Sequence, residues 1–111
     1  MYEYASYLES RMAVLLLRAG IPFLPHREIG LWDEKEQKVR YHSPDFTLFE
    51  SLLLFNEKEP VSVIECKGVL KPYNFDNQRM VEEQWGLPYL IVGDLKLSFW
   101  EAYGLLPQSY L

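Results

Sequence analysis

The stretch from Val61 to Lys67 constrains this chain more than any other, because it is a run rich in β-branched residues that also carries an acid and a base. A short apolar run of this kind predicts a buried strand. Strand side chains alternate between two faces. One face therefore carries four of them: Val61, Val63, Glu65 and Lys67. The pattern predicts that Glu65 and Lys67 project side by side from an interior strand.

The opposite face of this strand carries Ser62, Ile64 and Cys66. Cys66 is the only cysteine of the chain, which excludes an intramolecular disulfide. We interpret Cys66 as a buried core thiol, with a nucleophile as the alternative.

A second carboxylate, that of Asp45, follows Pro44 at the predicted end of an earlier strand. If Asp45 reaches the same place as Glu65, the two carboxylates can hold a hard divalent cation beside the ammonium group of Lys67. That combination is typical of metal-assisted phosphodiester hydrolysis. The alternative is a structural ion pair. Because burying three charges for stability alone is poorly rewarded, we favour catalysis.

Pro44-Asp45 followed by Glu65-Cys66-Lys67, with 65 − 45 = 20 positions between the acids, resembles the PD-(D/E)XK nuclease superfamily. The wider phrasing is similar to its small phage-type and mobile-element members. The resemblance implies an α/β fold with a restriction-endonuclease-like αβββαβ core, in which a mixed central sheet is flanked by helices. It also implies that Asp45, Glu65 and the Cys66 carbonyl bind the metal, and that Lys67 is catalytic.

Residues 4–19 have apolar side chains at helical spacing and predict an amphipathic helix that ends at Gly20. Glu9 flanks the apolar stripe of this helix. In several branches of the superfamily, notably Holliday-junction resolvases, a glutamate of the first helix completes the acidic site, so Glu9 is a catalytic candidate. The alternative is a capping box from Ser6 to Glu9, in which Glu9 only satisfies a backbone amide. The residues alone leave both interpretations open.

The middle of the chain predicts a hairpin, formed by the extended runs 21–32 and 37–42 around a polar turn. Its second strand is expected to continue through residues 46–49, with Asp45 at the bend. Residues 51–55 are strongly apolar and predict either a further strand or a hydrophobic flap.

After the Glu65 strand, residues 75–85 predict a second helix, capped by Asn74 or Asp76 and closed by Gly86. Residues 88–92 predict a short buried strand, and a last short helix carries Phe99, Trp100 and Tyr103. With 111 residues and 49% hydrophobic content, residues 1–111 are expected to form a single domain.

Contacts to DNA are expected from six side chains: Lys38, Arg40, His42, Lys71, Gln78 and Arg79. The hairpin cations could equally belong to a solvated edge strand, His42 could be a half-buried histidine, and Gln78 could face solvent. A net charge of −5 argues against binding nucleic acid by bulk electrostatics, although bound cations would offset the site carboxylates.

One cysteine and two histidines leave no cluster for structural zinc, so the metal should be held by oxygen. This predicts Mg²⁺, with Mn²⁺ as a substitute. The longest apolar stretch, residues 12–17, is too short for a membrane span, and the N-terminus lacks a signal-peptide pattern. We therefore expect a soluble cytoplasmic protein, of the kind that a phage or a mobile element encodes.

The function expected from these features is a Mg²⁺-dependent DNA endonuclease, with a Holliday-junction or branched-DNA resolvase as the preferred subtype. Such enzymes need paired active sites, so a homodimer is expected. The alternatives are a restriction-type or transposase-associated strand-cleaving subunit, and a catalytically inactive nuclease-fold module for binding or assembly.

Overall fold

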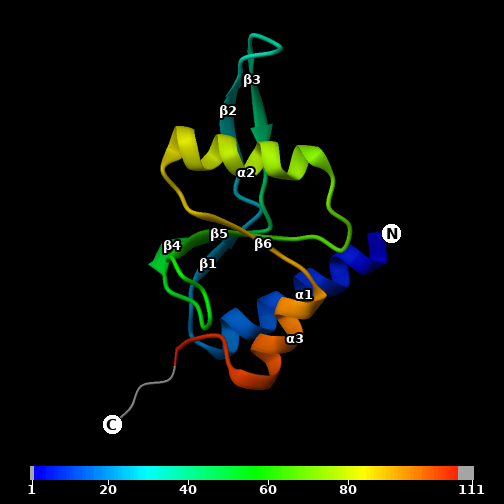
Figure 1. Cartoon of the computed structure of the whole chain (residues 1–111), viewed down its shortest axis with the longest axis vertical. Helices are drawn as coiled ribbons and strands as arrows, with labels where there is room; N and C mark the ends of the chain where they lie inside the picture. Colours follow the sequence, from blue (N-terminus) through cyan, green and yellow to red (C-terminus); the bar gives the residue numbers. More distant parts are fainter. Residues whose placement is uncertain (1, 108–111) are drawn as a thin grey trace.

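The computed structural model describes the backbone from residue 2 to residue 107 and the side chains from residue 6. The fold is α/β: a mixed sheet of parallel and antiparallel strands is flanked by helices (Figure 1). The elements in chain order are α1 (Tyr2–Arg18), β1 (Phe23–Pro25), β2 (Ile29–Asp33), β3 (Lys38–His42), β4 (Phe46–Leu52), β5 (Val61–Cys66), α2 (Pro72–Trp85), β6 (Tyr89–Val92) and α3 (Asp94–Tyr103).

The main sheet has the strand order β1-β4-β5-β6. Strand β4 runs antiparallel to both β1 and β5, whereas β5 and β6 are parallel and are joined through α2. Helices α1 and α3 pack together on one face of this sheet, and α2 packs on the other. The predicted α/β class, with a mixed sheet flanked by helices, is confirmed.

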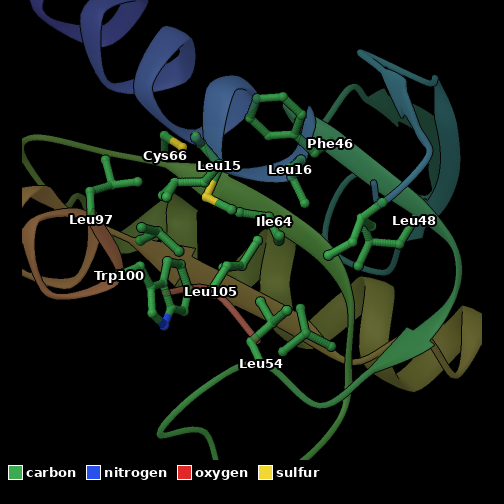
Figure 2. Close-up of a cluster of buried hydrophobic side chains, with 14 of the residues drawn as sticks. Leu15, Leu16, Phe46, Leu48, Leu54, Ile64, Cys66, Leu97, Trp100 and Leu105 are labelled. Atoms are coloured by element: carbon green, nitrogen blue, oxygen red, sulfur yellow. The ribbon is translucent and has the colours of Figure 1, made fainter. Parts of the chain in front are cut away.

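Strand β5 is the predicted buried strand, and all six of its residues are buried. Ile64 and Cys66 belong to the core beneath α1 and α3, which Figure 2 shows, while Val63 packs against α2. The placement of Val61 on the same face as Val63 is wrong, since Val61 joins the core on the α1 side. The register of β4 against β5 shifts between Thr47 and Leu52, the partner of Val61, and such irregularities twist a strand locally.

Helix α1 begins earlier than the apolar spacing indicated, at Tyr2 rather than at residue 4. Ser6 therefore lies inside the helix, where its carbonyl accepts a hydrogen bond from the hydroxyl of Ser10. A capping box needs its first residue at the helix boundary. The capping interpretation of Glu9 is consequently wrong.

Helix α2 also begins earlier than predicted, at Pro72 rather than at Phe75. Proline suits the first helical position because its missing N–H would have no partner there. Asn74 is not the N-cap; its Oδ1 accepts the backbone N–H of Lys71, at 2.8 Å, from inside the first turn. The predicted end is confirmed: Gly86 closes the helix in a left-handed conformation, with φ of 66°.

The predicted first hairpin strand is divided in two. Its start, β1, pairs with β4 of the main sheet, whereas β2 pairs with β3 in a separate two-stranded ribbon. His26 lies in the turn between β1 and β2 with φ of 51°. The ribbon extends past α2 at one end of the molecule, which measures 52 × 32 × 21 Å (Figure 1).

Helix α2 holds the ribbon through hydrogen bonds to the backbone of β2. The amide of Gln84 accepts the Trp32 N–H at 2.8 Å and donates to the Trp32 carbonyl at 2.9 Å, while the indole of Trp85 donates to the Gly30 carbonyl. These bonds satisfy one edge of the ribbon, and edges left open are prone to pairing with other chains.

Residues 51–55 form neither of the two predicted structures. Ser51 and Leu52 complete β4, and the following loop places Leu54 in the core with no exposed surface. Within residues 2–107, no helix is long and apolar enough to cross a membrane.

Candidate metal centre

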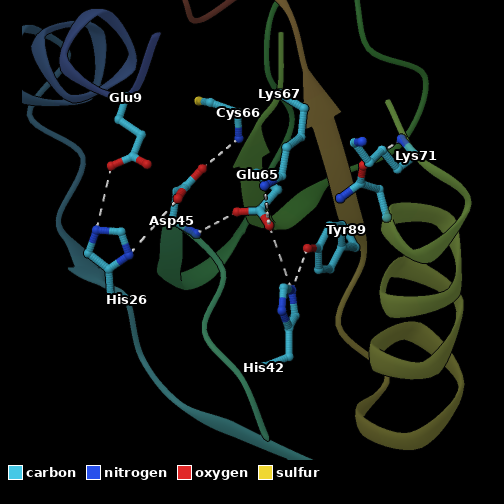
Figure 3. Close-up of polar contacts among 10 residues, drawn as sticks. Glu9, His26, His42, Asp45, Glu65, Cys66, Lys67, Lys71 and Tyr89 are labelled. Atoms are coloured by element: carbon cyan, nitrogen blue, oxygen red, sulfur yellow. Dashed lines mark hydrogen bonds and ion pairs between the residues drawn. The ribbon is translucent and has the colours of Figure 1, made fainter. Parts of the chain in front are cut away.

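Asp45 and Glu65 meet where β4 begins beside the end of β5. The pairing of Phe46 with Ile64 sets Asp45 opposite Glu65, although 20 positions separate them in the chain. Each carboxylate accepts a backbone N–H from the other segment: Glu65 Oε1 from Asp45 at 3.0 Å, and Asp45 Oδ2 from Cys66 at 2.7 Å (Figure 3). Only 7% of Asp45 and 5% of Glu65 are exposed, so two buried carboxylates are locked side by side.

Lys67 follows directly after β5, on the same side of the strand as Glu65. Its Nζ lies 3.9 Å from Glu65 Oε2, and its side chain is about one-third exposed. Asp45, Glu65 and Lys67 are therefore brought together, as the spacing of the motif predicted.

Glu9 and His26 complete a second set of ligands around Asp45. Glu9 Oε2 lies 3.5 Å from His26 Nε2, and His26 Nδ1 lies 3.9 Å from Asp45 Oδ1. One potential ligand atom from each of the three residues lies within 4.8 Å of the others, so the group could hold a metal ion. Glu9 thus faces the acidic site from α1, as Figure 3 shows.

His26 is absent from the ligands predicted from the sequence, which were all oxygen atoms. Its position follows from sheet pairing: Pro25 pairs with Phe46, and the backbone N–H of His26 donates to the carbonyl of Asp45 at 3.2 Å. No spacing along the chain signals this contact, because the predicted strand ran through His26 without a break. A turn after Pro25 is the only local sign that could have indicated it.

Charge is crowded in this centre. Burial, followed by the neighbouring charge of Glu65, raises the pKa of Asp45 to about 6. Burial and the charge of Asp45 likewise raise the pKa of Glu9 above its ordinary value. A cation placed among these oxygens would relieve both effects, since an opposite charge favours the ionised form.

His42 and Tyr89 support Glu65 from the other side. The Nε2 of His42 lies 2.6 Å from the Tyr89 hydroxyl, with their rings stacked, and 3.9 Å from Glu65 Oε2. Burial, assisted by the positive charges of Arg40 and Lys67, lowers the pKa of His42 to about 4. His42 is therefore neutral at pH 7. It is also half-buried, as expected if it is not a DNA contact. Tyr89 was missed because a tyrosine in a short apolar strand carries no distinctive signal.

The Cys66 side chain points away from the centre into the core, with 1% of the residue exposed. Burial raises the pKa of its thiol, so the thiolate needed for nucleophilic attack is disfavoured. The interpretation of Cys66 as a core thiol is confirmed. Only its backbone is at the centre, where its N–H binds Asp45.

The remaining DNA-contact candidates lie outside this cluster. Arg40 pairs with Asp33 at 3.3 Å, and Arg79 pairs with Glu83 at 3.3 Å on the surface of α2. Lys38 is exposed on β3, and Lys71 is exposed at the start of α2.

Gln78 faces the sheet rather than solvent. Its amide donates to the backbone carbonyl of Tyr89 at 2.7 Å, and the residue is half-buried. The solvent-facing interpretation of Gln78 is therefore wrong. Gln78 instead ties α2 to the strand that carries Tyr89, the hydrogen-bond partner of His42.

Comparisons with known proteins give no match: no family model, no curated protein and no solved structure is significantly similar to this chain.

Proposed function

We propose that this protein is a metal-dependent DNA endonuclease with a restriction-endonuclease-like core of the PD-(D/E)XK type. The observation that carries the proposal is the convergence of Asp45 and Glu65, each more than nine-tenths buried, with Lys67 beside them. Burying two carboxylates side by side lowers the stability of the folded protein. Such arrangements concentrate at functional sites.

The residues present fit a divalent cation. Asp45 would be the central ligand, with Glu65 on one side and Glu9 on the other. Carboxylate oxygens are the ligands that Mg²⁺ and Mn²⁺ prefer. When bound, such an ion supplies Lewis-acid polarisation of a phosphate and lowers the pKa of a water molecule.

The other side chains of the centre have separate roles in this proposal. Lys67, which is partly exposed, would reach a phosphate or the attacking water and stabilise negative charge that develops in the transition state. His42 and Tyr89 would hold Glu65 in place without carrying charge themselves. Because His42 is neutral at pH 7, it would add no positive charge to a phosphate contact.

Branched DNA is the preferred substrate class, because the Pro44-Asp45 and Glu65-Cys66-Lys67 motif, with Glu9 on the first helix, resembles that of Holliday-junction resolvases. The exposed Lys38 at the ribbon and Lys71 at the start of α2 are the cations best placed to meet a backbone phosphate. A homodimer would supply the paired sites that cutting two strands requires. A restriction-type or transposase-associated subunit would use the same centre with different partners.

A second candidate function, a binding or assembly module, is favoured by the outer face of the ribbon. This face exposes Trp32, Val39 and Tyr41, by 42, 53 and 65% respectively, and large exposed apolar groups often mark protein contacts. The net charge of −5 also suits a protein partner better than DNA.

The test is to incubate purified protein with a four-way junction, duplex DNA and single-stranded DNA in Mg²⁺, Mn²⁺ or EDTA. We expect metal-dependent cleavage that is abolished in Asp45→Asn, Glu65→Gln and Lys67→Ala. Glu50→Gln is the matched control, because Glu50 is exposed on β4 outside the centre. Circular dichroism checks that each variant is folded. A folded wild type that cuts none of these substrates with either ion would favour the binding module.

A further inference from the structure

A metal site made of carboxylate oxygens alone gives no role to the imidazole of His26, although this ring lies in the centre. It lies between Glu9 and Asp45, with a different ring nitrogen directed at each carboxylate (Figure 3). Both separations, 3.5 and 3.9 Å, are too long for good hydrogen bonds. The ring therefore lies near two carboxylates without forming a good hydrogen bond to either of them.

On the side that faces His26, the Oδ1 atom of Asp45 accepts no hydrogen bond from the described part of the chain. The other carboxylate oxygen, Oδ2, accepts the N–H of Cys66. Oδ1 is not one of the fully buried side-chain atoms without a partner in the described part of the chain, so water or an ion can reach it. Oδ1 faces His26, and Glu9, His26 and Asp45 bring potential ligand atoms within 4.8 Å of one another.

The backbone fixes His26 at this gap while its ring remains accessible. Pairing of β1 with β4 and the hydrogen bond from His26 N–H to Asp45 C=O set the position of the residue. Its side chain is 57% exposed, so the ring can turn to direct one nitrogen at an ion. The exposed side also leaves room for water or a phosphate oxygen.

We propose that His26 is a direct ligand of the cation in this centre, together with Glu9 and Asp45, and that it makes the site prefer Mn²⁺ to Mg²⁺. Carboxylates suit both ions. Mg²⁺ dehydrates reluctantly and takes oxygen ligands. Divalent first-row transition ions accept an imidazole nitrogen more readily, and Mn²⁺, the weakest-binding of them, is the probe that we choose. The inference rests on the proposed function only in taking Asp45 as the anchor of the ion.

Electron spin echo spectroscopy of the Mn²⁺-loaded protein tests this directly, because a coordinated imidazole adds a ¹⁴N modulation to the Mn²⁺ signal. The chain has two histidines. We expect the modulation in the wild type, its persistence in the control Glu50→Gln, whose altered residue is exposed on β4 outside the centre, and its loss in His26→Gln. Because His26 is largely exposed, His26→Gln should remain folded. Preparing the wild type with ¹⁵N-histidine should change the modulation and identify the imidazole as its source.

Calorimetric titration with each ion provides the second readout. His26→Gln should weaken Mn²⁺ binding by about tenfold or more while changing Mg²⁺ binding much less. If Mn²⁺ binds without nitrogen modulation, or the modulation survives in His26→Gln, the role of His26 is overturned while the carboxylate centre stands. If neither ion binds the wild type, both this inference and the proposed metal-dependent function fall.

Discussion

Replacing Asp45 with asparagine should make the cation-free protein more stable at neutral pH. Asparagine has nearly the shape of aspartate, and its Oδ1 can still accept the N–H of Cys66. The substitution removes a buried charge that lies beside Glu65 with no cation to balance it. The substitution should thus raise stability at a residue that the proposed function requires. Such a trade-off between stability and activity is common at functional sites.

The magnitude follows from the pKa of Asp45. A rise from 3.8 to about 6 on folding, at about 1.4 kcal/mol per pH unit, amounts to about 3 kcal/mol. Because the folded pKa is the higher one, the stability that Asp45 contributes is fully present below about pH 3.8 and is lost as the pH rises through 6. Asparagine does not titrate. Its hydrogen bond to Cys66 is weaker, since it lacks charge assistance, so we expect a net gain of about 1 to 3 kcal/mol at pH 7.5.

Urea unfolding followed by tryptophan fluorescence measures this gain. Wild type, Asp45→Asn and the exposed control Glu50→Gln are compared in EDTA at pH 4 and pH 7.5. The gain of Asp45→Asn should appear at pH 7.5 and shrink at pH 4, with no such change for Glu50→Gln. Added Mn²⁺ should stabilise the wild type but not Asp45→Asn. If Asp45→Asn is less stable than the wild type at pH 7.5, or if its effect is the same at both pH values, the charge-crowding argument is wrong.

Two further predictions concern the surroundings of the centre. Cys66 should react with iodoacetamide slower by a factor of about 10³ in buffer than in urea, because only the unfolded fraction exposes its thiol; equal rates would contradict its burial. Gln84→Ala should remove two hydrogen bonds to Trp32 and lower the local opening free energy of the ribbon by about 1 to 2 kcal/mol. Hydrogen exchange should then be faster for the amide of Trp32 and unchanged for the amides of β5, and a uniform change across both elements would refute a local role.

Some of this arrangement could be predicted because it depends on local pattern. The run from Val61 to Cys66 is buried as its apolar, β-branched composition indicated, and Glu65 and Lys67 share a face because strand side chains alternate. Helix existence was also predictable from periodicity. The starts of α1 and α2 were not, because end residues carry a weaker signal than the apolar stripe.

The hairpin shows where local pattern fails. Residues 21–32 have strand-like composition throughout, yet a left-handed turn at His26 sends β1 to the main sheet and β2 to the ribbon. Composition describes how well a residue fits a strand, whereas the choice of partner depends on which apolar surfaces are buried together. Here Ile29 and Leu31 of β2 pack against α2, which lies far along the chain.

The sequence by itself determined an interior strand that carries an acid and a base, and it marked Asp45 and Glu9 as partners for them. Only the tertiary structure decided that His26 faces Asp45 and that Tyr89 contacts His42. The physical reason is that alternation and helical period specify the directions of neighbouring side chains within one element. Contacts between elements depend instead on strand register and on the packing of the whole core, which no short stretch of the chain contains.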